Sequence, residues 1–134
     1  MPGYSNEDVE LGRCTLVVTC VVIKKDIYAH ENTALIIKRS EKEKEGPGLW
    51  TIPGGRLRMR DWGRRVRVPD ISHRVWVGVL TRAVKREIKE EAGIKVKRVQ
   101  LVQGRDKVFL RKDRTPTVIL VFRACVGPKT RVRI

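Results

Sequence analysis

The chain has 134 residues, of which 41% are apolar, and its 30 lysines and arginines against 15 aspartates and glutamates give a formal net charge of +15. This length excludes a multidomain protein, and we expect a single domain over residues 1–134. The positive net charge favours an anionic partner. The longest apolar run, Cys14–Ile23, is about half of the roughly 20 residues that a membrane helix needs. We therefore expect no membrane partner and a cytoplasmic location.

Two strands and a glycine turn are predicted in the first half of the chain. Residues 14–23 are rich in Val, Thr and Ile and predict a buried strand, and residues 33–40 predict a second one. Alternating Glu and Lys followed by Gly-Pro-Gly mark residues 41–48 as a loop. Gly54 and Gly55 then permit a ligand to approach the main chain closely. Something is therefore expected to bind near this turn.

A basic segment and a helix follow the glycine turn. Residues 56–74 contain seven arginines and two aspartates, and we predict a long loop there, with a short hairpin as an alternative. Leu80, Val84 and Ile88 recur at four-residue spacing and predict a helix over 80–92, which Gly93 would cap.

Strands are predicted after that helix, in the last third of the chain. These strands cover residues 95–103, 107–110 and 117–126, and a hairpin turn over 111–116 joins the last two. Strands on both sides of one long helix predict a mixed α/β domain.

The cysteines and the amide content indicate the redox state of the thiols and the kind of source organism. Cys14, Cys20 and Cys125 lie in apolar stretches without CxxC spacing, which favours buried, reduced thiols. The charged fraction is 34% while asparagine and glutamine together number only four, which favours a thermophilic source. A melting temperature at or below about 65 °C would contradict that source.

Three glutamates on the predicted helix indicate a metal site. At about 100° per residue, Glu87 and Glu91 fall within the apolar arc of the helix, and Glu90 falls just outside it. Carboxylates crowded at the rim of a core repel one another unless a cation lies between them, and oxygen ligands suit Mg²⁺ or Mn²⁺. An ordinary ion-paired surface helix is the alternative, which fits less well because Lys85 and Lys89 form a like-charge pair.

The run REIKEEAGI, residues 86–94, together with the preceding Pro53-Gly54-Gly55, resembles the Nudix box of the Nudix hydrolases. In that box Gly, five residues, Glu and seven residues precede the pattern Arg-Glu-apolar-x-Glu-Glu-x-Gly-apolar. The second half matches at all seven specified positions. The first half departs from the pattern, because Asp61 and Gly78 stand at the two counts where a glutamate is expected. Gly55 to Arg86 spans 31 positions instead of 14, so we expect a 17-residue insertion in a basic loop over 56–79.

The resemblance implies a Nudix-like α/β/α sandwich with a mixed sheet, here without the C-terminal helix that family domains usually have. It further implies that Glu87, Glu90 and Glu91 hold Mg²⁺, with Mn²⁺ as an alternative, and that the Gly55 carbonyl is a further ligand. Arg86 would orient these glutamates and belong to the catalytic set. The resemblance leaves the general base open between Glu90, Glu91 and a loop residue.

For the substrate, the resemblance implies a nucleoside diphosphate linked to another moiety, as in nucleoside triphosphates, ADP-ribose or dinucleoside polyphosphates. The residues expected to bind it are Gly54, Gly55, Arg56, Arg58 and Trp62. Trp62 is the candidate to stack on a base, whereas Trp50 is expected in the core.

The basic loop supports two alternatives to a small nucleotide. One is a nucleic-acid-binding module without turnover, and the other is a pyrophosphohydrolase acting on the 5′ end of RNA. A homodimer, in which a partner subunit covers one face of the sheet, is a further hypothesis that a sizing measurement tests.

Overall fold

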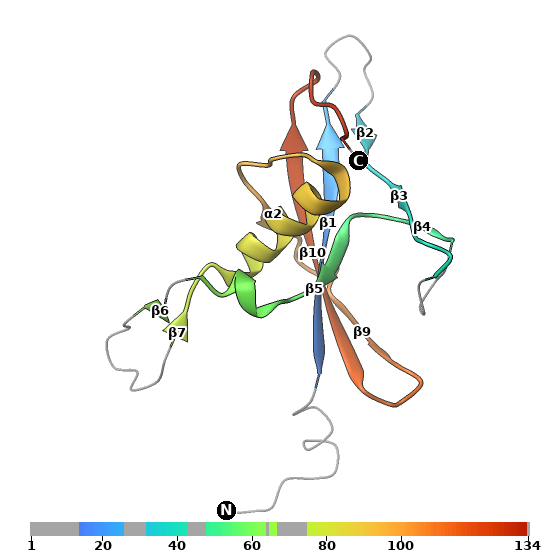
Figure 1. Cartoon of the computed structure of the whole chain (residues 1–134), viewed down its shortest axis with the longest axis vertical. Coiled ribbons are helices and arrows are strands. Elements are labelled where there is room, and N and C mark those ends of the chain that lie inside the picture. The colour runs from blue at the N-terminus through green and yellow to red at the C-terminus, as the bar shows by residue number, and fades with distance from the viewer. Residues whose placement is uncertain (1–13, 26–31, 43–47, 64, 67–74, 134) are drawn as a thin grey trace, which may run out of the picture.

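In the residues that the structure describes, the architecture is a mixed, curled β-sheet with one α-helix packed on it. The computed structural model describes residues 14–25, 32–42, 48–63, 65–66 and 75–133. Two long strands, β1 (Thr15–Lys24) and β10 (Pro116–Val126), run parallel side by side at the centre of the sheet (Figure 1). The strands predicted over 14–23 and 117–126 are therefore confirmed.

Shorter strands flank this central pair, and all of them run antiparallel to it. On β1 lie β2 (Thr33–Ala34) and β5 (Gly54–Arg56). On β10 lie β8 (Gln100–Leu101) and β9 (Lys107–Leu110), and the hairpin turn predicted over 111–116 joins β9 to β10. The sheet order is β2-β1-β10-β8, with β5 and β9 as further partners of the central pair.

The helix, α2 (Val79–Ala92), lies across one face of the sheet and begins one residue before its predicted start. Gly93 ends it in the left-handed conformation, with φ of 67°, and donates its N–H to the Lys89 carbonyl at 2.9 Å. The apolar face of the helix packs on alternate residues of β1 and β10, which face it because side chains alternate along a strand. The buried residues of this core are Val18, Cys20, Val22, Ala83, Val84, Ile88, Ala92, Ile94, Val96, Phe122 and Ala124.

Two small hairpins stand off the main sheet on opposite sides of α2 in Figure 1. One pairs β3 (Ile37–Lys38) with β4 (Trp50–Thr51). The other pairs β6 (Arg65–Val66) with β7 (Val75–Trp76), and it follows a single 3₁₀ turn, η1 (Met59–Asp61). The short hairpin given as an alternative for the basic segment is thus present.

Two predicted strands are shorter than expected. The strand predicted over 33–40 is split into β2 and β3, because the chain leaves the main sheet after Leu35, whose N–H still donates to the Val22 carbonyl at 2.9 Å, to join the β3–β4 hairpin. The strand predicted over 95–103 is paired only at β8, since Ile94 and Val96 turn into the core under α2 instead of extending the sheet.

Three side chains expected inside are exposed. Trp50 is 65% exposed, because it lies on the β3–β4 hairpin opposite Lys38 and not on the main sheet. Cys14 and Cys125 are also exposed, and only Cys20 lies in the core, where burial raises the pKa of its thiol to about 12. All three cysteines are free, as predicted.

Two findings concern helices that the described residues do not form. The described residues that follow β10 form no helix, in agreement with the fold predicted without a C-terminal one. Across the parts of the chain that the structure describes, no helix has the length and apolarity to cross a membrane.

Candidate active site

Gly54 and Gly55, predicted in a turn, lie instead in strand β5, because they pair with β1; we keep the name glycine turn for these two residues. They meet the acidic side of α2 at the middle of the sheet. Gly54 and Gly55 lie in β5, opposite Thr19 and Val18 of β1, and α2 packs over this strand. The Gly54 N–H donates to Oε2 of Glu91 at 3.3 Å. A Cβ atom on Gly55 would collide with the Glu87 carboxylate. Only glycine at position 55 therefore lets this carboxylate approach the main chain.

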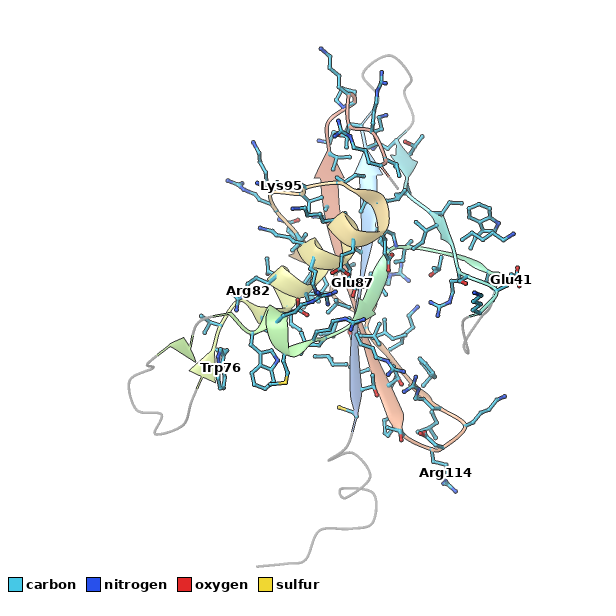
Figure 2. All side chains as sticks on the ribbon, viewed as in Figure 1. Glu41, Trp76, Arg82, Glu87, Lys95 and Arg114 are labelled. Atoms are coloured by element: carbon cyan, nitrogen blue, oxygen red, sulfur yellow. The ribbon has the colours of Figure 1, made fainter. Side chains whose placement is uncertain are left out.

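The three glutamates of α2 differ in burial, as their angular positions predict. Glu87 is 6% exposed, Glu91 is half-buried, and the Glu90 side chain is 43% exposed. Figure 2 shows Glu87 on the side of α2 that is turned toward β5. The apolar arc of the helix thus carries two carboxylates into the space beside the glycine turn.

Glu87 and Glu91 form a pair of carboxylates that share this space. Burial raises the pKa of Glu91 from 4.5 to about 7, and the negative charge of Glu87 contributes to this increase. The N–H bond from Gly54 acts in the opposite direction but does not cancel the increase. Near neutral pH Glu91 is therefore partly protonated, and a bound cation would displace that proton.

Arg86 holds the acidic groups together from the other side. Its Nη1 donates to Glu87 Oε1 at 2.7 Å and to Glu90 Oε2 at 3.1 Å, and its Nη2 donates to the Arg56 carbonyl at 3.2 Å. The neighbouring carboxylates raise the pKa of this guanidinium well above its usual range. Arg86 therefore has the orienting geometry that the resemblance implied.

Asp61 is a site residue whose role was not assigned from the sequence. It is 2% exposed, and its carboxylate forms a bidentate ion pair with Arg86. Nε of Arg86 donates to Oδ1 at 2.6 Å, and Nη2 donates to Oδ2 at 2.8 Å. These bonds hold the pKa of Asp61 below its usual value. The signal in the sequence was its spacing, because Asp61 stands six positions after Gly55, where the box has a glutamate.

The position of Asp61 also locates the extra residues. The first half of the box has its ordinary length up to Asp61, and 24 residues instead of seven separate Asp61 from Arg86. The 17 extra residues therefore belong after Asp61, and include the β6–β7 hairpin. The expected insertion over 56–79 begins too early, because residues 56–61 form the end of β5 and the η1 turn beside α2.

Glu90 is engaged differently from the other two glutamates. Its Oε1 accepts from Nη2 of Arg60 at 2.6 Å while Oε2 faces Arg86. Within the described residues no group of three or more His, Cys, Asp or Glu side chains is gathered closely enough to hold a metal ion. The donor set that fits a divalent cation here is the Glu87–Glu91 pair, two carboxylates brought together beside the main chain of Gly54 and Gly55.

The expected substrate-binding residues lie around this pair with unequal exposure. Arg56 and Arg58 are exposed beside the glycine turn. Trp62 is only partly exposed, because its ring packs on that of Trp76 with centroids 5.0 Å apart and an interplanar angle of 58°. The aromatic contact of Trp62 in the structure is therefore a tilted one with Trp76 of β7.

Comparisons of sequence and structure point to one family. Among solved structures, the chain is similar to a MutT protein from Methanosarcina mazei Go1, with a TM-score of 0.60 and 21% identity over 91% of this chain and 70% of that one. It is similar to the NUDIX domain of Shewanella oneidensis NrtR complexed with ADP ribose, with a TM-score of 0.64 and 16% identity over 98% and 71% of the two chains.

A third similar structure is an Ap4A hydrolase from C. elegans, with a TM-score of 0.52 and 16% identity over 90% of this chain and 74% of that one. These likenesses establish a shared fold, and no curated protein sequence matches the chain. The family model of the NUDIX domain matches residues 15–133. The chain therefore belongs to the Nudix family of hydrolases, which act on pyrophosphate bonds.

Proposed function

We propose that the protein is a Mg²⁺-dependent pyrophosphohydrolase whose substrate is a nucleoside diphosphate linked to another moiety. Nucleoside triphosphates, ADP-ribose and dinucleoside polyphosphates are the substrate types in this class. The observation that carries the proposal is the Glu87–Glu91 carboxylate pair, half-enclosed between α2 and the glycine turn and held by Arg86.

The carboxylates and the glycine turn have separate roles in this proposal. Glu87 and Glu91 would hold the cation, with the Gly55 carbonyl as the further ligand and Glu90 joining them when it leaves Arg60. A divalent cation bound there neutralises pyrophosphate charge and lowers the pKa of a bound water. Arg86 keeps Glu87 oriented through the 2.7 Å bond, so the carboxylate is in place before the cation arrives.

The anionic substrate would be received by the exposed arginines beside the turn. Arg56 and Arg58 lie next to Gly55, and a guanidinium binds a phosphate with two parallel hydrogen bonds. At the same place the main chain of Gly54 and Gly55 is in contact with the Glu91 and Glu87 carboxylates, so a phosphate received there would lie next to the cation site. Trp62 would contact a base through the ring edge or face that Trp76 does not cover.

The test is phosphate or nucleotide release from a panel of nucleoside triphosphates, ADP-ribose and dinucleoside polyphosphates, with Mg²⁺, with Mn²⁺ and with a chelator. We expect one member to be hydrolysed with Mg²⁺ and none with the chelator. Glu87→Gln and Glu91→Gln should each lower the rate at least 100-fold, whereas Glu41→Gln, an exposed carboxylate outside α2, should not. Wild-type rates in both α2 variants would overturn the assignment of the site.

A nucleic-acid substrate is the second candidate, favoured by the charge of the chain and of its insertion. The net charge is +15, and Arg56, Arg58 and Arg60 are all exposed just before the insertion. If the substrate is the 5′ end of an RNA, binding to a triphosphorylated oligonucleotide should weaken steeply as salt rises. Hydrolysis of a free nucleotide but not of the oligonucleotide, with no RNA binding at low salt, would exclude this candidate.

A further inference from the structure

The insertion leaves and rejoins the domain through a narrow neck beside the first turn of α2. The outgoing segment of the neck contains Trp62 and Gly63, and the returning segment contains Val77 and Gly78. Both glycines adopt the left-handed conformation, with φ of 69° and 70°. In Figure 2, Arg82 lies at the end of α2 that is nearest to the hairpin carrying Trp76.

A single guanidinium closes this neck. Nε of Arg82 donates to the Asp61 carbonyl at 2.8 Å, and its Nη2 donates to the Trp62 carbonyl at 2.5 Å and to the Val77 carbonyl at 2.6 Å. The Asp61 and Trp62 carbonyls lie where the chain enters the insertion, and the Val77 carbonyl lies where the chain returns from it. Arg82 therefore ties the two segments of the neck to each other and to α2.

The glycines of the neck make room for this side chain. A Cβ atom on Gly63 would lie 2.7 Å from Cζ of Arg82, and one on Gly78 would lie 3.0 Å from Nη1. A side chain at position 63 would displace the guanidinium from its three acceptors. The glycines at positions 63 and 78 thus leave the room that the Arg82 guanidinium needs to reach its three carbonyl acceptors.

The contacts of Arg82 lead directly to the carboxylate site. Asp61 offers its carbonyl to Arg82 and its carboxylate to Arg86, and Arg86 in turn bonds Glu87. If the neck opened, Asp61 would lose the bond from Arg82 and keep its two bonds with Arg58, whose carbonyl accepts the Asp61 N–H at 3.0 Å and whose N–H donates to Oδ2 at 2.9 Å. Of its hydrogen bonds to α2, Asp61 would then retain only those of the ion pair with Arg86.

We propose that Arg82 is a positioning residue of this active site, which locks the neck of the insertion so that Asp61 and Arg86 hold Glu87 in place. The proposal rests on the proposed function for its activity assay. It explains how a chain with 17 extra residues inside its box keeps the second half of the box in working geometry. The same fixation would be supplied in an uninterrupted box by the short connection itself.

The first experiment compares Arg82→Ala and Arg82→Lys with Lys89→Ala, an exposed cation on the same helix. Both Arg82 variants should lower kcat about 10- to 100-fold with little change in KM, because residues that support ligands typically have effects of this size. Lysine should not rescue, since an ammonium lacks the planar fork that reaches all three carbonyls. Wild-type kcat in both Arg82 variants, or the same loss in Lys89→Ala, would overturn the proposal.

A double-mutant cycle separates positioning from a general structural role. Excision of residues 62–78 joins Asp61 to Val79 and restores the seven-residue spacing of the box. Because the neck is then absent, Arg82→Ala should change kcat less than about threefold in the excised chain. An undiminished loss in the excised chain would contradict the proposal. If the excised chain does not fold, the comparison of alanine, lysine and Lys89 variants still decides.

A readout without substrate keeps this inference distinct from the proposed function. In the NMR spectrum of the wild type, the Nε–Hε signal of Arg86 should be protected from exchange by its bond to Asp61. Arg82→Ala should lose that protection and Lys89→Ala should keep it. Retained protection in Arg82→Ala would overturn the inference even in an active enzyme. Failure of the wild type to hydrolyse any member of the panel would instead overturn the proposed function.

Discussion

Two regions of the molecule are stabilised by different interactions. They are the interface between α2 and the sheet, and the neck of the β6–β7 hairpin. The first is a layer of fully buried aliphatic side chains, among them Val18, Val84 and Ile88. The second consists of hydrogen bonds from the exposed side chain of Arg82 to three carbonyls, plus one ring contact. Among the described residues of 62–78, none belongs to the buried core.

This difference separates what keeps the domain folded from what keeps the site aligned. Burial is spread over many residues, so the sheet and helix should tolerate changes in the insertion. Alignment of the carboxylates passes through Asp61, Arg82 and Arg86, each of which makes several hydrogen bonds between η1, the neck and α2. We therefore expect changes in the core to alter stability and changes around the neck to alter activity.

The largest expected effect on stability comes from Ile88→Ala. Ile88 is 0% exposed at the centre of the helix–sheet contact, and removing its buried side-chain carbons should lower the free energy of unfolding by about 3 to 4 kcal/mol. Excision of 62–78 should lower it by less than about 1 kcal/mol, since the described part of that segment contributes no core residue. Urea denaturation of both variants checks this contrast, and a larger loss on excision would reverse it.

Asp61→Asn should affect both stability and activity. Breaking its buried pair with Arg86 leaves the guanidinium without its main partner, at a cost of about 3 kcal/mol near pH 7. Because the pKa of Asp61 is below its usual 3.8 in the folded protein, its contribution is complete above that value and is lost as the pH falls through the folded pKa. Denaturation at pH 7 and pH 3 should show the difference between wild type and variant shrinking, and a constant difference would contradict the ion pair.

Gly55→Ala should weaken cation binding about 10- to 100-fold. The added methyl group collides with the Glu87 carboxylate and displaces it from the pair. Gly127→Ala is the matched control, because a methyl group at that position would have no neighbour within 4 Å. Titration with Mn²⁺ compares the two variants, and equal affinities would show that close approach at position 55 is not required.

Gly63→Ala should lower kcat about tenfold by pushing the Arg82 guanidinium out of the neck. Gly104→Ala carries the same strain of a left-handed residue, with φ of 74° against 69°, but faces open space. The excess loss in Gly63→Ala over Gly104→Ala therefore isolates the contact with Arg82. Identical kinetics for the two variants would mean that the neck does not influence the site.

The sequence predicted the elements whose pattern is periodic. Four-residue spacing gave α2 to within one residue, and the same angular argument placed Glu87 and Glu91 toward the core and Glu90 outside it. The central strands β1 and β10 followed from their runs of β-branched residues. These predictions succeed because burial of one face determines the local pattern.

What the sequence did not predict depends on contacts between distant segments. The pairing of Asp61 with Arg86 joins residues 25 positions apart, and an aspartate in place of the expected glutamate concealed it. The three acceptors of Arg82 are main-chain carbonyls, which carry no signature in the sequence. Trp50 was misplaced because the β3–β4 hairpin leaves the main sheet, a choice made by packing and not by local pattern.

The most direct test of the account is the affinity for Mg²⁺ as a function of pH, measured by calorimetry without substrate. The pKa of Glu91 is about 7 in the metal-free protein, so a cation bound by the Glu87–Glu91 pair must displace a proton below that pH. We expect the affinity to rise about tenfold per pH unit up to about pH 7 and then to level off, and to be lost in Glu91→Gln. An affinity that is independent of pH and unchanged in Glu91→Gln would contradict a cation site at this carboxylate pair.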